Sequence, residues 1–155
     1  MKSPVNQVFN VSDSLVDSLY CIVDQVRPGA AIGIQGTLRD DVQCRGHILF
    51  LYNGVCGPLG FIKGKILGAP VFQQWCGNIV QSKIDSLFVD KRYHRSGIGG
   101  TLLRTYEEYC CANGVGAIVL QRVPTIQAAQ FYSRHGYINI GGKYIMGKIL
   151  NTNKR

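Results

Sequence analysis

Residues 87–103, LFVDKRYHRSGIGGTLL, join an apolar run to a helical pattern through a turn rich in glycine. The apolar run ends a strand predicted over Ile79–Val89, and the amphipathic helix continues to Cys110. Glycines at the mouth of a helix let the backbone approach a ligand closely. The first helical turn also has unpaired N–H donors and partial positive charge. This segment therefore predicts a site for an anion such as a pyrophosphate.

Two common phosphate-binding motifs fit the sequence poorly. A P-loop requires G-x-x-x-x-G-K-[ST], and the nearest match, Gly142–Lys148, is followed by Ile149. A dinucleotide fingerprint requires G-x-G-x-x-G, whereas Gly97-x-Gly99 is followed by Leu102. From the residues alone, the remaining alternative to an anion site is a plain glycine-rich turn.

The rest of the chain alternates helical and strand patterns, which indicates one mixed α/β domain. Residues 34–45 have no assignable pattern. We expect the domain to span residues 1–150, followed by a polar tail over residues 151–155. The other predicted elements are a helix capped by Ser12 and ended by Pro28-Gly29, a hairpin of His47–Tyr52 and Val55–Ile66 around Asn53-Gly54, a buried strand Ala117–Leu120, a helix from Thr125 to Gly136, and a strand Tyr144–Leu150.

The composition is that of a folded chain that attracts anions. Hydrophobic residues make up 46% of the 155 residues and charged residues 17%, which excludes a disordered chain. A net charge of +8 favours phosphates, nucleic acid or a membrane surface, without choosing among them. Because no run of 18 apolar residues and no apolar signal core is present, we expect a cytoplasmic protein with no transmembrane helix.

Six cysteines occur, at positions 21, 44, 56, 76, 110 and 111. None forms a C-x-x-C pair, and no Cys/His spacing matches a zinc site, so no metal site is expected. We expect all six to be reduced thiols that pack as small buried hydrophobes. A catalytic cysteine is the alternative.

Two motifs resemble those of the GNAT superfamily of acyl-CoA N-acyltransferases. The first is the segment Leu87–Leu103, and the second is AAQFYSRHGY over Ala128–Tyr137, which is similar to A-x-x-F-Y-x-x-x-G-F. They occur in the expected order, with a strand between them. The resemblance covers residues 79–150 and implies a mixed, mostly antiparallel sheet flanked by helices, with splayed central strands.

The resemblance also implies which residues bind acetyl-CoA, the expected co-substrate. Backbone groups of Phe88 and Val89 would contact the pantetheine arm, and the Val89 N–H could polarise the thioester carbonyl. Thr125 stands where this family often has a cofactor-contacting Asn, and His94 where it usually has Gln or Arg. The loop that would hold the pyrophosphate consists of His94, Arg95, Ser96, Gly97, Ile98, Gly99 and Gly100.

Two catalytic candidates follow from the implied reaction, the attack of a neutral amine on a thioester. Tyr132, by its position in the F-Y pair, is the candidate general acid for the departing thiolate, with a core tyrosine as the alternative. Asp85 shares a strand face with Val89. A carboxylate on an apolar strand needs a task or a partner. It could relay the amine's proton through water, or pair with a nearby Lys or Arg.

The expected activity is transfer of an acetyl group to a primary amine on a small molecule or a protein, by direct attack. The alternatives are a non-catalytic CoA-binding module and an RNA- or ribosome-directed acetyltransferase, which the charge permits. Nucleic acid is not favoured as a partner and a membrane is not expected, and the chain is a monomer or a homodimer. We expect the first helix and residues 34–45 to build the acceptor pocket, with Asp40 and Asp41 as candidate carboxylates.

Overall fold

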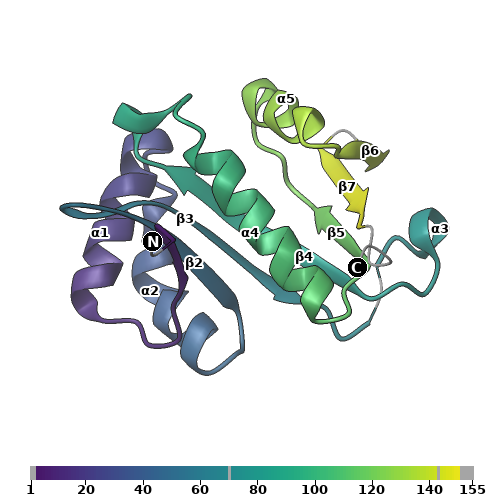
Figure 1. Cartoon of the computed structure of the whole chain (residues 1–155), viewed down its shortest axis with the longest axis horizontal. Coiled ribbons are helices and arrows are strands. Elements are labelled where there is room, and N and C mark those ends of the chain that lie inside the picture. The colour runs from purple at the N-terminus through teal and green to yellow at the C-terminus, as the bar shows by residue number, and fades with distance from the viewer. Residues whose placement is uncertain (1–2, 70, 143, 151–155) are drawn as a thin grey trace. The chain divides into compact units, whose positions relative to one another are not determined.

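The computed structural model describes residues 3–69, 71–142 and 144–150 (Figure 1). The predicted tail over residues 151–155 lies outside the described residues. Two compact units are present: Met1–Gly64 with Ser86–Tyr106 (unit 1), and Lys65–Asp85 with Glu107–Arg155 (unit 2). The elements are β1 (Val5–Gln7), α1 (Asp13–Val26), α2 (Ala31–Gln43), β2 (Ile48–Gly54), β3 (Gly57–Ile66), α3 (Gln73–Cys76), β4 (Gln81–Val89), η1 (Lys91–Tyr93), α4 (Ile98–Ala112), β5 (Ala117–Leu120), α5 (Ile126–Arg134), β6 (Ile138–Gly141) and β7 (Ile145–Ile149).

Hydrogen bonding orders the seven strands β1-β2-β3-β4-β5-β7-β6. β4 and β5 pair in parallel, whereas the pairs β1–β2, β2–β3, β5–β7 and β6–β7 are antiparallel. The β4–β5 ladder covers only Gln81–Lys83, although β4 continues to Val89. These pairings confirm the predicted α/β fold, with a mostly antiparallel sheet whose central strands part.

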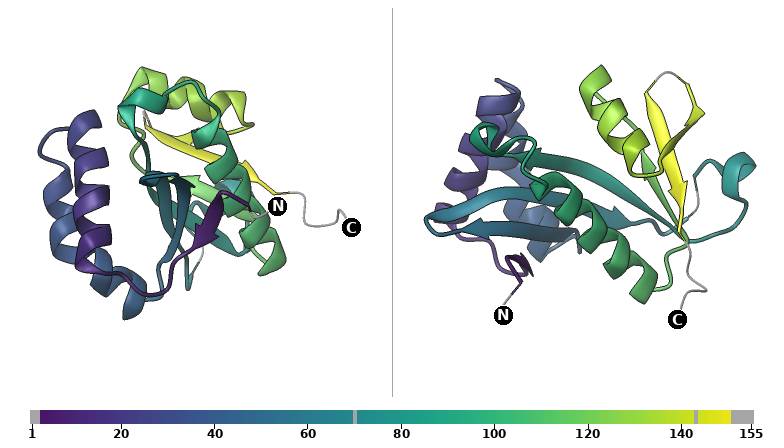
Figure 2. Two further views of the ribbon diagram at one scale, coloured as in Figure 1. Left: turned by 60° about the vertical axis from the view of Figure 1, so that its left-hand side comes forward. Right: turned by 45° about the horizontal axis from the view of Figure 1, so that its top comes forward.

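In unit 1, helices α1 and α2 lie side by side and cover one face of β2 and β3 (Figure 2). The core between these layers includes Leu19 and Val23 of α1, Leu38 of α2, and Leu49 and Phe61 of the strands. Burial of this apolar surface is the main free energy that holds the layers together.

Helix α1 confirms the prediction made from its ends. The Ser12 hydroxyl oxygen accepts a hydrogen bond from the N–H of Leu15 at 3.1 Å, as an N-cap does. The helix ends at Val26, and the chain reverses through Gly29, whose φ is +90°.

Two parts of unit 1 differ from the sequence predictions. Residues 34–45, without assignable pattern, lie mostly in α2, where Gly33 and Gly36 interrupt the apolar periodicity. The hairpin turn is Val55-Cys56 and not Asn53-Gly54, because Gly54 pairs with Gly57 in the ladder. Asn53 remains in β2 because two hydrogen bonds hold it against the β1 segment. Its N–H donates to Pro4 O at 2.8 Å, and its side-chain amide donates to the side-chain oxygen of Asn6.

Unit 2 contains α5 and the strands β5, β6 and β7. The predicted strand Ala117–Leu120 is β5, and the predicted last strand is β7. The predicted helix after Thr125 is α5, which the Thr125 side chain caps by accepting from Ala128 N–H at 3.0 Å. The short elements β1, α3 and β6 were not predicted, because segments of three or four residues carry no periodicity to detect.

The six cysteines are free thiols, but the prediction that all are buried is wrong. Cys110 is buried, whereas Cys21, Cys44 and Cys56 are exposed. Burial raises the pKa of the Cys110 thiol to about 12, so it carries no thiolate at neutral pH. Within the described residues, no helix combines the length and the apolar character that crossing a membrane requires.

A buried ion pair anchors α2 to the sheet of unit 1. The Lys63 ammonium donates to Asp41 Oδ2 at 2.7 Å, and the two side chains are 9% and 10% exposed. Burial alone would raise the pKa of Asp41. The hydrogen bond and charge of Lys63, with the charges of His47 and Arg45, outweigh burial and hold that pKa below its ordinary value.

Asp41→Asn should lower the free energy of unfolding by about 3 kcal/mol at pH 7, because it leaves Lys63 buried without a counter-charge. Urea unfolding measures this change. Asp40→Asn is the matched control, since that neighbouring side chain is 56% exposed and its ion pair contributes little.

The difference between wild type and Asp41→Asn should also depend on pH. A lowered carboxyl pKa stabilises the fold fully above the unfolded value of about 3.9, and this contribution is lost as the pH falls through the folded value. A difference that stays constant from pH 7 to pH 2.5 would contradict this assignment.

Candidate functional site

The turn from β4 into α4, in unit 1, is held by one buried carboxylate. Asp90 is 4% exposed, and its N–H donates to Leu59 O of β3 at 2.7 Å. Its Oδ1 accepts from the N–H and Nε of Arg92 at 3.0 and 3.2 Å, and its Oδ2 from Nη2 at 3.0 Å. This hydrogen bonding holds the pKa of Asp90 below its ordinary value. The positive charge of Arg92 is therefore paired with the Asp90 carboxylate within the turn and is not available to a ligand.

His94 ties the same turn back to the end of β4. Its Nε2 lies 2.9 Å from Val89 O. Since a carbonyl oxygen only accepts, Nε2 must carry a proton and Nδ1 is the nitrogen left for a ligand. Ser96 also points into the turn, because its hydroxyl and its N–H both donate to Tyr93 O.

The first turn of α4 leaves backbone donors available. The N–H and hydroxyl of Thr101 both donate to Gly97 O at 3.0 Å, which begins the helical ladder. The N–H groups of Ile98, Gly99 and Gly100 precede it and have no acceptor within the helix. The φ of Gly97 is +87° and that of Arg95 is +66°, so the chain enters α4 through left-handed backbone. The arrangement is the one that binds an anion.

The end of β4 presents backbone rather than side chains. The Phe88 ring stacks on Phe61 with centroids 5.8 Å apart, so this side chain belongs to the packing of unit 1. Backbone groups alternate between the two edges of a strand, and Asp90 N–H faces β3. The Val89 N–H therefore points to the other edge, away from β3.

Tyr132, in α5 of unit 2, is 7% exposed and has rings packed edge-on around it. The ring centroids of Phe131 and Tyr137 lie 5.2 and 5.5 Å from its own. Burial raises the pKa of Tyr132 above its ordinary value, so the hydroxyl is protonated throughout the neutral range.

Asp85 and Thr125, also in unit 2, each have a structural partner. Lys83 Nζ lies 3.3 Å from Asp85 Oδ1, with side chains 33% and 21% exposed, so the predicted ion pair is present. The general-base role of Asp85 stays a prediction. The hydroxyl oxygen of Thr125 caps α5, which leaves its O–H for a ligand.

The structure thus gathers the candidate residues into two groups. Phe88, Val89 and the loop His94–Gly100 are together in unit 1, whereas Asp85, Thr125 and Tyr132 are in unit 2. Sequence reasoning missed the role of Asp90, although an Asp just before a basic 3₁₀ turn is a detectable capping signal.

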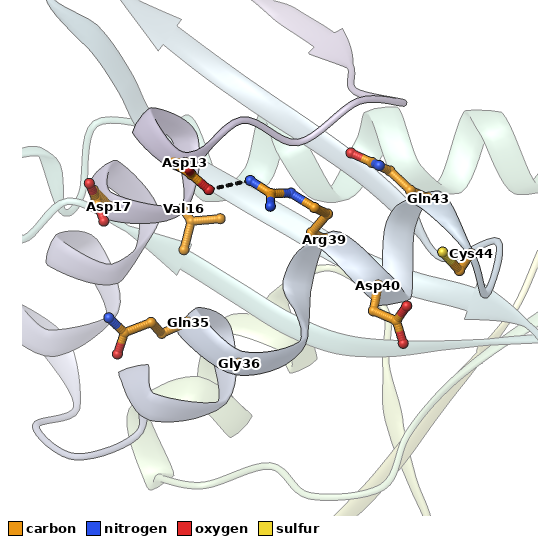
Figure 3. Close-up of a pocket in the computed structure, with 9 residues that line it drawn as sticks. All are labelled: Asp13, Val16, Asp17, Gln35, Gly36, Arg39, Asp40, Gln43 and Cys44. Carbon is orange, nitrogen blue, oxygen red and sulfur yellow. Dashed lines mark hydrogen bonds and ion pairs between the residues drawn. The ribbon is translucent and has the colours of Figure 1, made fainter.

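A cavity of about 440 Å³ lies between α1 and α2 in unit 1 (Figure 3). Arg39 forms an ion pair with Asp13 at this cavity. Asp40 lines it, whereas Asp41 faces Lys63, so only the first of the two predicted acceptor carboxylates is available. The lining residues are Asp13, Val16, Asp17, Gln35, Gly36, Arg39, Asp40, Gln43 and Cys44.

In the comparison with protein families, a family model described as an acetyltransferase (GNAT) domain matches residues 63–153. A search of curated protein sequences finds no match.

Solved structures share the fold. An acetyltransferase of the GNAT family from Staphylococcus aureus is 18% identical, with a TM-score of 0.68 over 95% of this chain and 99% of that one. PaiA N-acetyltransferase of Thermoplasma acidophilum, in complex with coenzyme A, is 16% identical with a TM-score of 0.65 (96% and 99%). The ribosomal-protein-S18-alanine N-acetyltransferase of Escherichia coli is 15% identical with a TM-score of 0.68 (95% and 94%).

Gly97→Ala should lower the free energy of unfolding by about 1 kcal/mol or more, because a side chain is strained at this left-handed φ even though a Cβ would meet nothing within 4 Å. Urea unfolding checks this result. The same substitution at Gly33, in helix α2 and equally open, should instead stabilise by about 0.5–1 kcal/mol. Equal effects at the two positions would contradict the strain assigned to Gly97.

Proposed function

This chain belongs to the family of GNAT acetyltransferase domains, and we propose that it transfers the acetyl group of acetyl-CoA to a primary amine by direct attack. The observation that supports this most is the β4–α4 turn, which combines three free helical N–H donors with the outward-facing N–H of Val89. The E. coli and T. acidophilum structures that share the fold are named as N-acetyltransferases.

The residues of unit 1 suit the cofactor. The donors of Ile98, Gly99 and Gly100, with the Arg95 cation, match the negative oxygens of a pyrophosphate. At the end of β4, the Val89 N–H is the backbone donor that faces away from β3 and suits the pantetheine arm, whereas the expected Phe88 groups face β3 by the same alternation. Coenzyme A is present in the structure of the T. acidophilum protein of this fold.

When bound, acetyl-CoA supplies a thioester carbonyl and a thiolate leaving group. The Val89 N–H donates to the carbonyl oxygen as negative charge develops there. Asp85 accepts the amine's proton through water, in the role of general base. The amine nitrogen forms the new bond to the carbonyl carbon, the carbon–sulfur bond breaks, and the sulfur leaves as a thiolate that accepts a hydrogen bond from the Tyr132 hydroxyl and is then protonated by water.

The pKa of Tyr132 defines its part in this step. A free thiol has a pKa of about 8.5 and a tyrosine of about 10, so full proton transfer from a buried tyrosine to a thiolate is uphill. Tyr132 therefore contributes by donating its hydroxyl proton in a hydrogen bond that strengthens as the sulfur becomes charged. Burial guarantees that the proton is present.

A non-catalytic CoA-binding module is the second candidate. It is favoured by the ion pair of Asp85 with Lys83, which engages the candidate general base and leaves the predicted cofactor-binding loop untouched. Binding of acetyl-CoA with no acetyl transfer to any amine would select this candidate.

Gly97→Glu should abolish acetyl-CoA binding in isothermal titration, because it sets bulk and negative charge beside the donors of α4. Gly97→Gln has the same backbone strain and nearly the same size but no charge. Its Kd for acetyl-CoA should therefore be at least about tenfold lower than that of Gly97→Glu, because only glutamate repels the phosphates. No binding by the wild type at millimolar acetyl-CoA would contradict the proposed cofactor, and equal binding by both variants would contradict the site.

Tyr132→Phe should lower kcat for acetyl transfer by about a hundredfold, as removal of one hydrogen-bond donor to a developing charge does, with an unchanged Kd for acetyl-CoA. Steady-state kinetics and titration measure the two quantities. Tyr52→Phe removes a hydroxyl from strand β2 and serves as the control. A kcat within threefold of the wild type would remove Tyr132 from the mechanism.

A further inference from the structure

A polar cluster lies beneath α5 in unit 2, formed by Glu107, Tyr137 and Lys148. The Tyr137 hydroxyl donates to Glu107 Oε2 at 2.8 Å. The Lys148 ammonium lies 3.2 Å from both carboxylate oxygens of Glu107 and 5.6 Å from the centroid of the Tyr137 ring. Tyr137 is 2% exposed, so its ring is fixed at the hydroxyl end by an ion pair and on one face by a cation.

Helix α5 ends in a Schellman motif that joins Tyr137 to Tyr132. The N–H of Tyr137 donates to Tyr132 O at 3.0 Å, and the N–H of Gly136, with φ +91°, donates to Ser133 O at 3.1 Å. This motif commonly brings the side chains at these two positions into contact. Here the two rings meet edge to face, 5.5 Å apart and inclined at 66°.

Gly136 also fits the cluster closely. A Cβ at this glycine would stand 3.4 Å from Cε of Lys148, which is ordinary to tight contact. The Lys148 side chain therefore packs both against the backbone of the Schellman motif and against the Tyr137 ring. Any swing of the Tyr137 ring about χ1 must break its bond to Glu107.

Packing alone does not explain this cluster. A phenylalanine at position 137 would fill the same space without a buried hydroxyl that needs a partner. A buried charged pair is likewise weak evidence for stability, since apolar residues often replace one without loss. What the cluster provides is a single orientation for the surface against which Tyr132 lies.

We propose that Glu107 and Tyr137 are positioning residues that hold the Tyr132 hydroxyl in its reactive orientation, with Lys148 completing the anchor. This inference rests on the proposed role of Tyr132 in acetyl transfer. Neither residue touches the reacting atoms in this scheme. Their effect reaches the reaction only through the ring of Tyr132.

Tyr137→Phe tests the proposal, because it keeps the ring and the Schellman motif and removes only the anchored hydroxyl. We expect kcat to fall about tenfold, as small misplacements of a reacting group do, while the KM for acetyl-CoA changes less than twofold. Tyr52→Phe should leave both constants unchanged.

Glu107→Gln, which removes the charge, should reproduce part of the loss, and the double variant should be no slower than Tyr137→Phe alone, because both changes break one bond. Multiplicative losses would show that the two residues act separately and would overturn the proposal. A loss of thermal stability in Tyr137→Phe with unchanged kcat would show a structural role only and would also overturn it.

Fluorine NMR gives a readout that does not need activity. Protein labelled with 3-fluorotyrosine shows a Tyr132 signal, identified by its loss in Tyr132→Phe. This signal should move or split in Tyr137→Phe and stay in place in Tyr52→Phe. If it does so while the wild type transfers no acetyl group, the positioning stands and the proposed function fails. An unmoved signal contradicts the positioning, whatever the activity.

Discussion

The buried carboxylate of Asp90 is the interaction on which the candidate cofactor site depends. It fixes the end of β4 against β3 and closes the turn by binding the backbone and the guanidinium of Arg92. Only with that turn closed can His94 reach back to Val89 O and can Gly97 start α4 with its N–H groups directed outward. Because Arg92 is neutralised and one nitrogen of His94 is engaged, the site offers chiefly backbone dipoles, which suit an extended, multiply charged ligand held by many weak contacts.

In the proposed mechanism, unit 2 supplies a different kind of group, the single proton donor Tyr132. Burial keeps the Tyr132 proton in place at neutral pH, and burial also deprives the ring of freedom. The Schellman turn at Gly136 places Tyr137 against it, and Glu107 with Lys148 holds Tyr137. The local backbone geometry and the long-range ion pair thus both restrain the Tyr132 ring, and a preorganised reaction site needs such support around its reacting groups.

Local signals in the sequence predicted the parts of this fold that local forces determine. Ser12 and Thr125 cap helices as expected, and the glycine turn before α4 lies where its spacing indicated. Helix α2 escaped prediction because its stability comes from packing on α1, not from its own pattern. Tyr137 and Lys148 lie 30 and 41 positions after Glu107, so no spacing rule joins the three residues. The ion pair of Asp41 with Lys63 likewise depends on which strand residue becomes its neighbour after folding.

The central claim, direct acetyl transfer to an amine, is tested most directly by single-turnover mass spectrometry. Protein in excess over acetyl-CoA is mixed with a panel of primary amines, or with none, and the acetyl group is followed among CoA, amine and intact protein. We predict free CoA and acetylated amine only when an acceptor is present, with the mass of the protein unchanged. Stoichiometric release of CoA without an amine, together with an acetyl group on one of the six cysteines, would contradict direct attack. Acetyl-CoA left intact by every amine would contradict the transferase itself.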